Sequence, residues 1–179
     1  MLTRSMQKAV LVNKRAFFVI GPESSGTRMM TQAFISSGAY GDGGHAQKLD
    51  KDGFNEGHKL IVLRRSVPHG VNMPPITKLI NRMQNSGYKV IPIVILRDKD
   101  KCAQSQVKRG HASNLKGATT SIERAVDHIY NHLSNFSMPF HVIHYEPFVK
   151  SEKVRNAFFS RFNLPPPKID FFNANEKYS

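Results

Sequence analysis

Residues 15–31 constrain the fold more strongly than any other stretch, and their sequence is RAFFVIGPESSGTRMMT. Residues 17–20 are β-formers without a polar interruption, as expected of a strand that is buried on both faces. Residues 21–26 form a glycine-bounded loop, and residues 27–38 show helical spacing of apolar side chains. Such a loop directs backbone N–H groups to one point beside the positive end of the helix dipole. The sequence therefore predicts an anion-binding loop between a strand and a helix.

The loop matches a nucleotide-binding P-loop in its two glycines but not in its lysine. The P-loop pattern is Gly, four residues, Gly, then Lys and Ser or Thr. Thr27 stands at the lysine position, and Arg28 follows it. A nucleoside triphosphate would therefore lack its usual clamp on the β- and γ-phosphates. A strand–helix turn without a ligand has a similar composition, so this simpler interpretation stays open.

Further apolar segments alternate with helical patterns along the chain. We expect strands at residues 59–65, 89–96 and 140–145, and helices starting near residues 74, 100 and 151 and after a capping box at residues 120–123. Pro92 is unusual in a central strand, so we expect its strand to lie beside an edge or to carry a bulge. This alternation predicts an α/β fold with a parallel sheet of about four to five strands flanked by helices. Ligands of such sheets bind at the carboxyl ends of the strands.

The length of 179 residues suits one domain with its own hydrophobic core. We expect a single domain over residues 1–179, with a loose lead-in at 1–14 and an extended tail at 165–179. No run of about 18 apolar residues could span a membrane, and the first residues lack the apolar core of a secretory signal. A cytoplasmic location is therefore expected. The single Cys102 excludes an intrachain disulfide, and no residue spacing indicates a metal site.

The net charge of +13 indicates an anionic partner. Nucleic acid, an anionic nucleotide, an acidic glycan and a membrane surface all have the required charge. The basic residues are spread along the chain, and neither a zinc-finger spacing nor an RNA-binding aromatic motif is present. Nucleic acid is therefore not the expected partner.

A second motif follows the strand expected at residues 89–96. Arg97 ends this strand, and Ser105 lies eight residues later in the next expected helix. A guanidinium at a strand end and a hydroxyl from the following helix can converge on one phosphate. The alternative is a helix end with solvated charges.

With these two motifs in place, the chain resembles the sulfotransferases that use 3′-phosphoadenosine-5′-phosphosulfate. Their first motif is a P-loop-like turn without the lysine, and residues 25–28, Ser-Gly-Thr-Arg, are similar to it. Their second motif is an Arg at a strand end with a Ser eight residues later, as at Arg97 and Ser105. Their third is a late strand ending in Tyr-Glu, as at Tyr145, before a helix and a Leu-containing turn. The resemblance covers roughly residues 15 to 165. Because the tail of these enzymes often returns to the nucleotide, it also implies such a return for residues 173–178, with a frayed terminus as the alternative.

This resemblance implies a P-loop NTPase-like three-layer sandwich and transfer of a sulfuryl group to a hydroxyl or amine. The donor would be 3′-phosphoadenosine-5′-phosphosulfate, the product adenosine 3′,5′-bisphosphate, and no metal is expected. The acceptor would be polar or anionic, with a saccharide as one such class. The candidate nucleotide-binding residues that the resemblance implies are Gly21, Ser24, Ser25, Gly26, Thr27, Arg28, Arg97, Ser105 and Tyr145.

Two positions depart from the family pattern. Ser24 stands where the family commonly has a Lys or Arg beside the leaving oxygen, and Arg28 or Arg64 is the candidate replacement. Ser66 stands where cytosolic members have a His that removes the proton of the acceptor. His69 is our candidate for that role, because an imidazole of ordinary pKa suits proton removal near neutral pH. Glu23 and His45 are the alternatives.

Two other functions remain open. A P-loop kinase or other NTPase would explain the glycine loop, although the lysine and a strand ending in a Walker-B-type Asp are missing. A catalytically inactive, basic binding module on the same fold would explain the serines at positions 24 and 66.

Overall fold

The computed structural model describes residues 14–41, 57–70 and 72–178. Its strands are β1 (Arg15–Pro22), β2 (Tyr40–Gly41), β3 (Leu60–Val67), β4 (Lys89–Leu96) and β5 (His141–His144). Its α-helices are α2 (Thr27–Ser36), α4 (Ile76–Asn85), α5 (Lys99–Lys108), α6 (Leu115–Leu133), α7 (Tyr145–Lys150) and α8 (Glu152–Ser160). A 3₁₀ helix, η1 (Ala174–Tyr178), follows them.

The five strands form one parallel sheet in the order β2-β3-β1-β4-β5. The predicted α/β fold with a parallel sheet of four to five strands is thereby confirmed. Strand β1 lies in the centre and pairs with β3 on one side and β4 on the other. Because all strands are parallel, their carboxyl ends meet at one edge, which carries the loop after β1.

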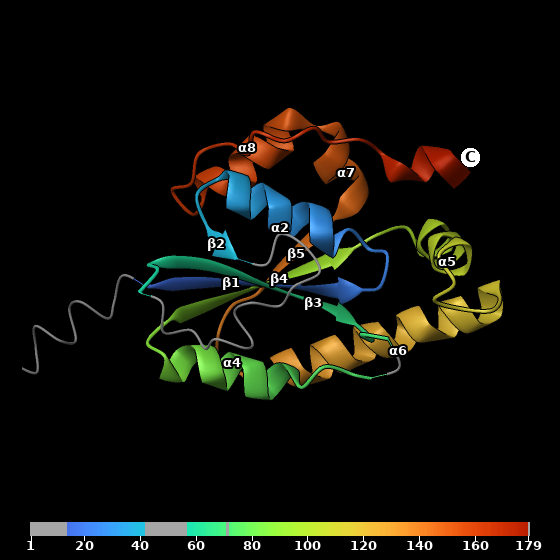
Figure 1. Cartoon of the computed structure of the whole chain (residues 1–179), viewed down its shortest axis with the longest axis horizontal. Coiled ribbons are helices and arrows are strands. Elements are labelled where there is room, and N and C mark those ends of the chain that lie inside the picture. The colour runs from blue at the N-terminus through green and yellow to red at the C-terminus, as the bar shows by residue number, and fades with distance from the viewer. Residues whose placement is uncertain (1–13, 42–56, 71, 179) are drawn as a thin grey trace, which may run out of the picture.

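Side chains of β1 alternate between two hydrophobic cores, one on each face of the sheet. Ala16, Phe18 and Ile20 face the core that α4 and α6 cover, as the members of that core show. Phe17 and Val19 belong to the other core, which α2, α7 and α8 cover. Figure 1 shows these helices above and below the sheet. The strand is buried on both faces, as its unbroken apolar sequence predicts.

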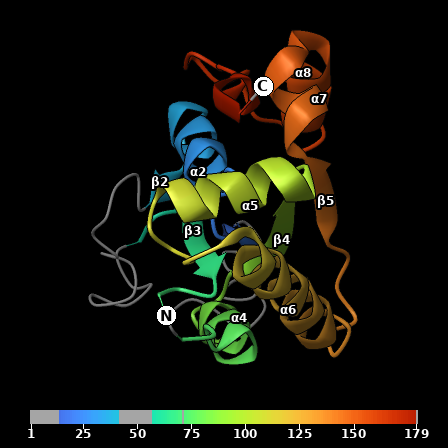
Figure 2. The same ribbon diagram turned by 90° about the vertical axis from the view of Figure 1, so that its right-hand side faces the viewer.

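Helix α5 lies apart from these two layers, at the edge where the strands end. Figure 2 shows it in front of the sheet, between α2 and α6. Cys102 and Ala103 of α5 pack with Ala118 and Ile122 of α6 in a small third cluster. This packing holds α5 against the loop that follows β1.

Three local expectations can be compared with the structure. Helix α6 begins at Leu115, where the Asn114 side chain accepts a hydrogen bond from the Gly117 N–H, so the capping box expected at residues 120–123 is wrong. The expected extended tail is wrong over Ala174–Tyr178, which form the 3₁₀ helix η1. Pro92 does lie in a strand next to an edge, and the pairing of β4 with β5 starts only at Ile93.

In the part of the chain that the structure describes, none of the helices combines the length and the apolar character that a membrane-spanning helix needs.

Candidate functional site

The loop between β1 and α2 has a backbone that only a few residue types can adopt. Ser24 and Gly26 have positive φ angles of 67° and 106°. A side chain at position 26 would also collide with a neighbour, since a Cβ there would lie 2.7 Å from Cδ2 of Tyr145. The loop is closed by a 3.0 Å hydrogen bond from the Ser25 N–H to the Pro22 carbonyl. Glycine at position 26 therefore serves both the turn and the packing of the Tyr145 ring.

The start of α2 leaves backbone donors at this loop. The first hydrogen bond inside the helix joins the Met30 N–H to the Gly26 carbonyl at 3.1 Å. The N–H groups of residues 27–29 therefore have no partner within the helix, as at any helix start. Gly26 is the N-cap and has no side chain that could accept from them. A helix start of this kind attracts anions.

Helix α5 holds the loop from the outside. The Gln106 Nε2 donates to the Glu23 carbonyl at 2.9 Å, and the Cys102 Sγ donates to the same oxygen at 3.2 Å. Cys102 is buried, and its burial raises the pKa of the thiol to about 12. The thiol therefore stays protonated and can donate over the whole physiological pH range.

Arg97 lies just after β4 and reaches the loop. Its Nη1 donates to the Ser24 carbonyl at 2.8 Å, and its Nε donates to Oδ1 of Asn175 at 2.6 Å. Its guanidinium carbon lies 4.9 Å from the centre of the Tyr145 ring. The third nitrogen, Nη2, is buried and has no hydrogen-bond partner among the described residues.

Buried polar atoms without partners gather at this place. Within the described part of the chain there are four such side-chain atoms, and three of them are Oγ of Ser24, Oγ of Ser25 and Nη2 of Arg97. Leaving a buried polar group unpaired costs about 1–3 kcal/mol, so proteins rarely leave several together. All three lie at or next to the loop between β1 and α2.

Tyr145 forms one wall of the site. It is almost completely buried, although it starts the short helix α7 at the end of β5. Its hydroxyl donates to the Phe172 carbonyl at 3.2 Å and accepts from the Ala174 N–H at 3.0 Å. The ring thus lies against Gly26 on one side and Arg97 on another, and its hydroxyl holds the C-terminal segment.

Thr27 and Ser66 connect α2 with the end of β3. Their hydroxyl oxygens lie 3.4 Å apart, and Ser66 is paired in register with Gly21 of β1. Ser66 is the residue at which the family pattern has a His. In this protein it therefore contacts a loop residue and offers a hydroxyl rather than an imidazole at that place.

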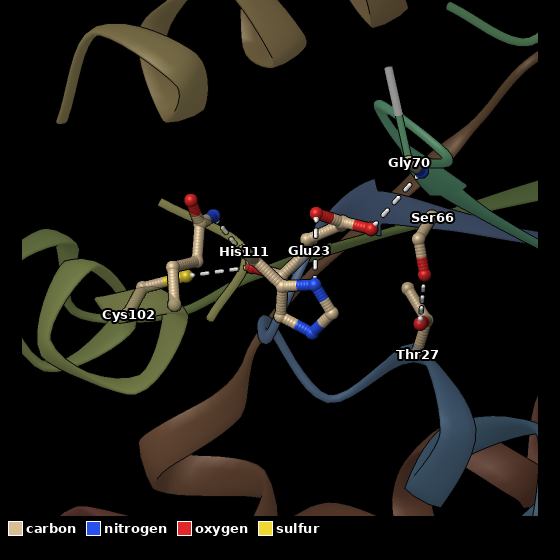
Figure 3. A network of polar contacts seen from close by, with 7 residues as sticks. Glu23, Thr27, Ser66, Gly70, Cys102 and His111 are labelled. Atoms are coloured by element: carbon tan, nitrogen blue, oxygen red, sulfur yellow. Dashed lines mark hydrogen bonds and ion pairs between the residues drawn. The ribbon is translucent and has the colours of Figure 1, made fainter. Parts of the chain in front are cut away.

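The side chain of Glu23, in the loop after β1, contacts the segments that follow β3 and α5, as Figure 3 shows. Its Oε1 accepts from the Gly70 N–H at 3.4 Å, and its Oε2 lies 3.7 Å from Nδ1 of His111. The side chain of Glu23 is 13% exposed and that of His111 is 40% exposed. At 3.7 Å the two groups are too far apart for a hydrogen bond, and they form an ion pair only when the imidazole is protonated.

The remaining predicted residues take different positions. Ser105 lies on the buried side of α5, together with Cys102 and Gln106. Arg28 is exposed on the first turn of α2, and Arg64 is half-buried in β3. His69 is exposed, and its backbone pairs with that of Asn72 in a turn after β3. His45 lies outside the described residues.

Two residues of the site were missing from the sequence interpretation. They are Gln106, from the interior of α5, and His111, from the turn after that helix. His111 carried a signal, because it follows Gly110, whose positive φ of 73° ends α5. Asn175 lies in residues 173–178, for which the resemblance implied a return to the site, and its Oδ1 lies 2.6 Å from Nε of Arg97.

Comparison with models of known protein families finds no match for this chain, and comparison with curated proteins finds no significantly similar sequence. The resemblance to sulfotransferases stays a prediction from the motifs. Within the described ranges, no three side chains of His, Cys, Asp and Glu gather in the way that would hold a metal ion.

Proposed function

We propose that the protein binds a 3′-phosphorylated adenine nucleotide and acts as a sulfotransferase with 3′-phosphoadenosine-5′-phosphosulfate as donor. The observation that carries this proposal is the cluster of buried, unpaired polar atoms on Arg97, Ser24 and Ser25. Phosphate and sulfate groups supply the several acceptor oxygens that such a cluster needs.

The residues present fit this donor in two respects. Arg97 combines a fixed position with an unpaired nitrogen, which suits a phosphate contact at the end of β4. The Tyr145 ring, which packs against Gly26 and Arg97, holds the loop and the guanidinium beside each other, where a nucleotide phosphate would bind. A Lys at position 27 would be expected for triphosphate hydrolysis, and Thr27 stands there instead.

The donor would supply an activated sulfuryl group, and the chain would supply charge stabilisation and orientation. The N–H groups at the start of α2 and the Thr27 hydroxyl stabilise negative charge that develops on the leaving phosphate. Arg28 and Arg64 are the candidate cations, and Arg28 follows the loop directly. Preorganised donors of this type typically account for a large part of the rate in group transfer.

For removal of the acceptor's proton, the pair of Glu23 and His111 is a stronger candidate than His69. The carboxylate of Glu23 lies on the loop itself and 3.7 Å from the imidazole of His111, whereas His69 lies in an exposed turn. The imidazole of His111 accepts the proton and then forms an ion pair with Glu23.

The inactive binding module remains the second candidate function, and one observation favours it. Ser66 replaces the family's imidazole and contacts Thr27 in a hydroxyl–hydroxyl pair. Such a protein would bind the nucleotide without transferring its sulfuryl group.

The test is a thermal-shift titration with adenosine 3′,5′-bisphosphate, compared with ADP and with ATP in the presence and absence of Mg²⁺. A ligand at about 100 times its dissociation constant stabilises a protein by about 2.7 kcal/mol, which is readily detected. We expect a shift with the 3′,5′-bisphosphate without metal. A shift with Mg²⁺-ATP alone would support a kinase or NTPase and contradict the proposal. Transfer of ³⁵S-labelled sulfuryl groups to a panel of saccharides then separates an enzyme from a binding module.

A further inference from the structure

The C-terminal turn η1 returns to the candidate nucleotide site and contacts Arg97. The side chain of Asn175 is 9% exposed, and its Oδ1 accepts from Nε of Arg97 at 2.6 Å. Figure 1 shows the C-terminal segment passing α7 and ending near α5. The C-terminal turn thus accepts a hydrogen bond from Arg97, the residue on which the proposed nucleotide binding depends.

The hydrogen-bond geometry of Arg97 shows how well Asn175 fits this place. Nε and Nη2 lie on one edge of a guanidinium and form a fork that matches two oxygen atoms of a phosphate or carboxylate. Asn175 occupies Nε with one neutral oxygen, while Nη2 is without a partner among the described residues. The amide therefore uses half of a fork that a phosphate would fill completely, and with charge.

Tyr178, at the end of η1, lies among cations. Its ring centre is 5.8 Å from the guanidinium of Arg97 and 5.6 Å from Nζ of Lys108. Its carbonyl accepts a hydrogen bond from Nζ of Lys101. Three cations thus surround an aromatic ring and a carbonyl, which are weaker partners for them than a phosphate dianion.

Release of the turn would leave few groups unpaired. Nδ2 of Asn175 donates to Oε1 of Glu146 at 2.8 Å, and this oxygen also accepts from the Asp98 N–H at 2.9 Å. Glu146 therefore keeps a partner when Asn175 leaves. Arg97 keeps its bond to the Ser24 carbonyl, so the guanidinium stays oriented toward the loop.

We propose that Ala174–Tyr178 is an autoinhibitory segment that competes with the phosphate of the ligand for Arg97. The inference rests on the proposed function only in taking Arg97 as an anion-binding residue. Its consequence is that the measured dissociation constant equals the intrinsic one divided by the fraction of molecules in which the segment has left. Weakening the segment should therefore tighten binding.

The test measures binding by calorimetry with two probes, adenosine 3′,5′-bisphosphate and inorganic pyrophosphate. The proteins are the full chain, the double variant Asn175→Ala/Tyr178→Ala and a chain that lacks residues 174–179. This deletion removes one Glu and one Lys, so the net side-chain charge is unchanged. We expect about tenfold tighter binding in both variants. This corresponds to a full chain in which the segment has left Arg97 in roughly one molecule in ten. Asn131→Ala, at an exposed position of α6, is the control and should bind like the full chain.

Hydrogen exchange gives a second readout. Adding the bisphosphate to the full chain should raise deuterium uptake in residues 174–178, whose N–H groups include those bonded to Tyr145 and Asn173. Lower uptake there, with weaker binding in both variants, would mean that the turn closes over the ligand and would overturn the proposal.

The remaining outcomes separate this inference from the proposed function. Equal affinity for the bisphosphate in all proteins would overturn the autoinhibitory role and leave the nucleotide site standing. Tighter binding of pyrophosphate alone would support the segment's role but contradict the nucleotide. If neither probe binds to any of the proteins, both proposals are wrong.

Discussion

The three nitrogens of the Arg97 guanidinium differ in their hydrogen-bond partners. Nη1 donates to a loop carbonyl and Nε to the Asn175 side chain, while Nη2 has no partner among the described residues. The unpaired Nη2 does not stabilise the fold, whereas the hydrogen bonds of Nη1 and Nε do. Replacement of Arg97 should therefore lower both the stability of the protein and the proposed ligand affinity.

We predict that Arg97→Ala weakens binding of adenosine 3′,5′-bisphosphate by about 1.5–3 kcal/mol, or roughly 10- to 150-fold, the usual size of a lost charge-assisted contact. Isothermal titration calorimetry measures the change. Arg124→Ala, which removes the same charge from an exposed position of α6, is the control and should leave affinity almost unchanged. Equal affinity of the Arg97 variant and the native protein would exclude Arg97 from the site.

Two glycines allow the backbone and packing requirements of the loop to be separated. Gly26 and Gly38 both have positive φ, at 106° and 99°, but a Cβ at position 38 would meet nothing within 4 Å. Both substitutions by Ala carry the conformational penalty of about 1–2 kcal/mol. We predict that Gly26→Ala costs about 1–3 kcal/mol more than Gly38→Ala in urea denaturation, because its Cβ collides with Tyr145. Equal losses would show that the Tyr145 ring moves aside without cost.

At the scale of elements, α5 supports the loop between β1 and α2. It contacts the loop through the Glu23 carbonyl, and it reaches this position because the pair Cys102 and Ala103 packs on α6. The order of the loop should therefore depend on side chains that do not touch a ligand.

We predict that Gln106→Ala lowers the free energy of unfolding by about 1–2 kcal/mol, since it removes a partner of the buried Glu23 carbonyl. It should also weaken nucleotide binding, as the loop loses its support. Gln104→Ala, at a half-exposed position of the same helix, is the matched control and should change stability by less than about 0.5 kcal/mol. A similar loss of stability in the two variants would contradict the supporting role of α5.

Local sequence predicted the elements well wherever their pattern was strong. The apolar run of β1, the glycine loop and the helical start of α2 depend on neighbouring residues, so their types were predictable. The start of α6 was mispredicted because two capping signals compete, and the Asn114 side chain takes the role that we assigned to Thr120. Gln106 was missed because its partner Glu23 lies 83 positions away in sequence and only the fold brings the two together.

On the scale of the whole molecule, two histidines are expected to make the stability of the fold depend on pH. Nδ1 of His132 in α6 lies 2.7 Å from Oγ1 of Thr77 in α4, on one side of the sheet. The ring of His141 in β5 packs against Phe162 on the other side. Burial lowers the pKa of both, with smaller contributions from the charges of His128 and Arg161, respectively.

We predict that the melting temperature falls as pH is lowered from about 7.5 to 5. In the unfolded chain each imidazole takes up a proton near pH 6.5, whereas in the folded protein its pKa is lower and the proton binds only at a lower pH. The stabilisation is therefore complete above about pH 6.5 and is lost as pH falls through the lowered pKa values. The double variant His132→Gln/His141→Gln, followed by circular dichroism, should show a shallower dependence. The same slope in both proteins would contradict this assignment.

The order of the strands has a consequence for how the chain folds. β1 is synthesised first and lies in the centre, but its neighbours β3 and β4 come only at residues 60–67 and 89–96. Every pairing in this sheet is parallel, so none can start from a local hairpin. Chains rich in such distant pairings fold slowly, and their unpaired apolar strands can associate with other chains in the meantime. The four apolar residues 17–20 therefore lack one of their two neighbouring strands until about 70 further residues have been synthesised, and during that time they are exposed to chaperones and to other chains.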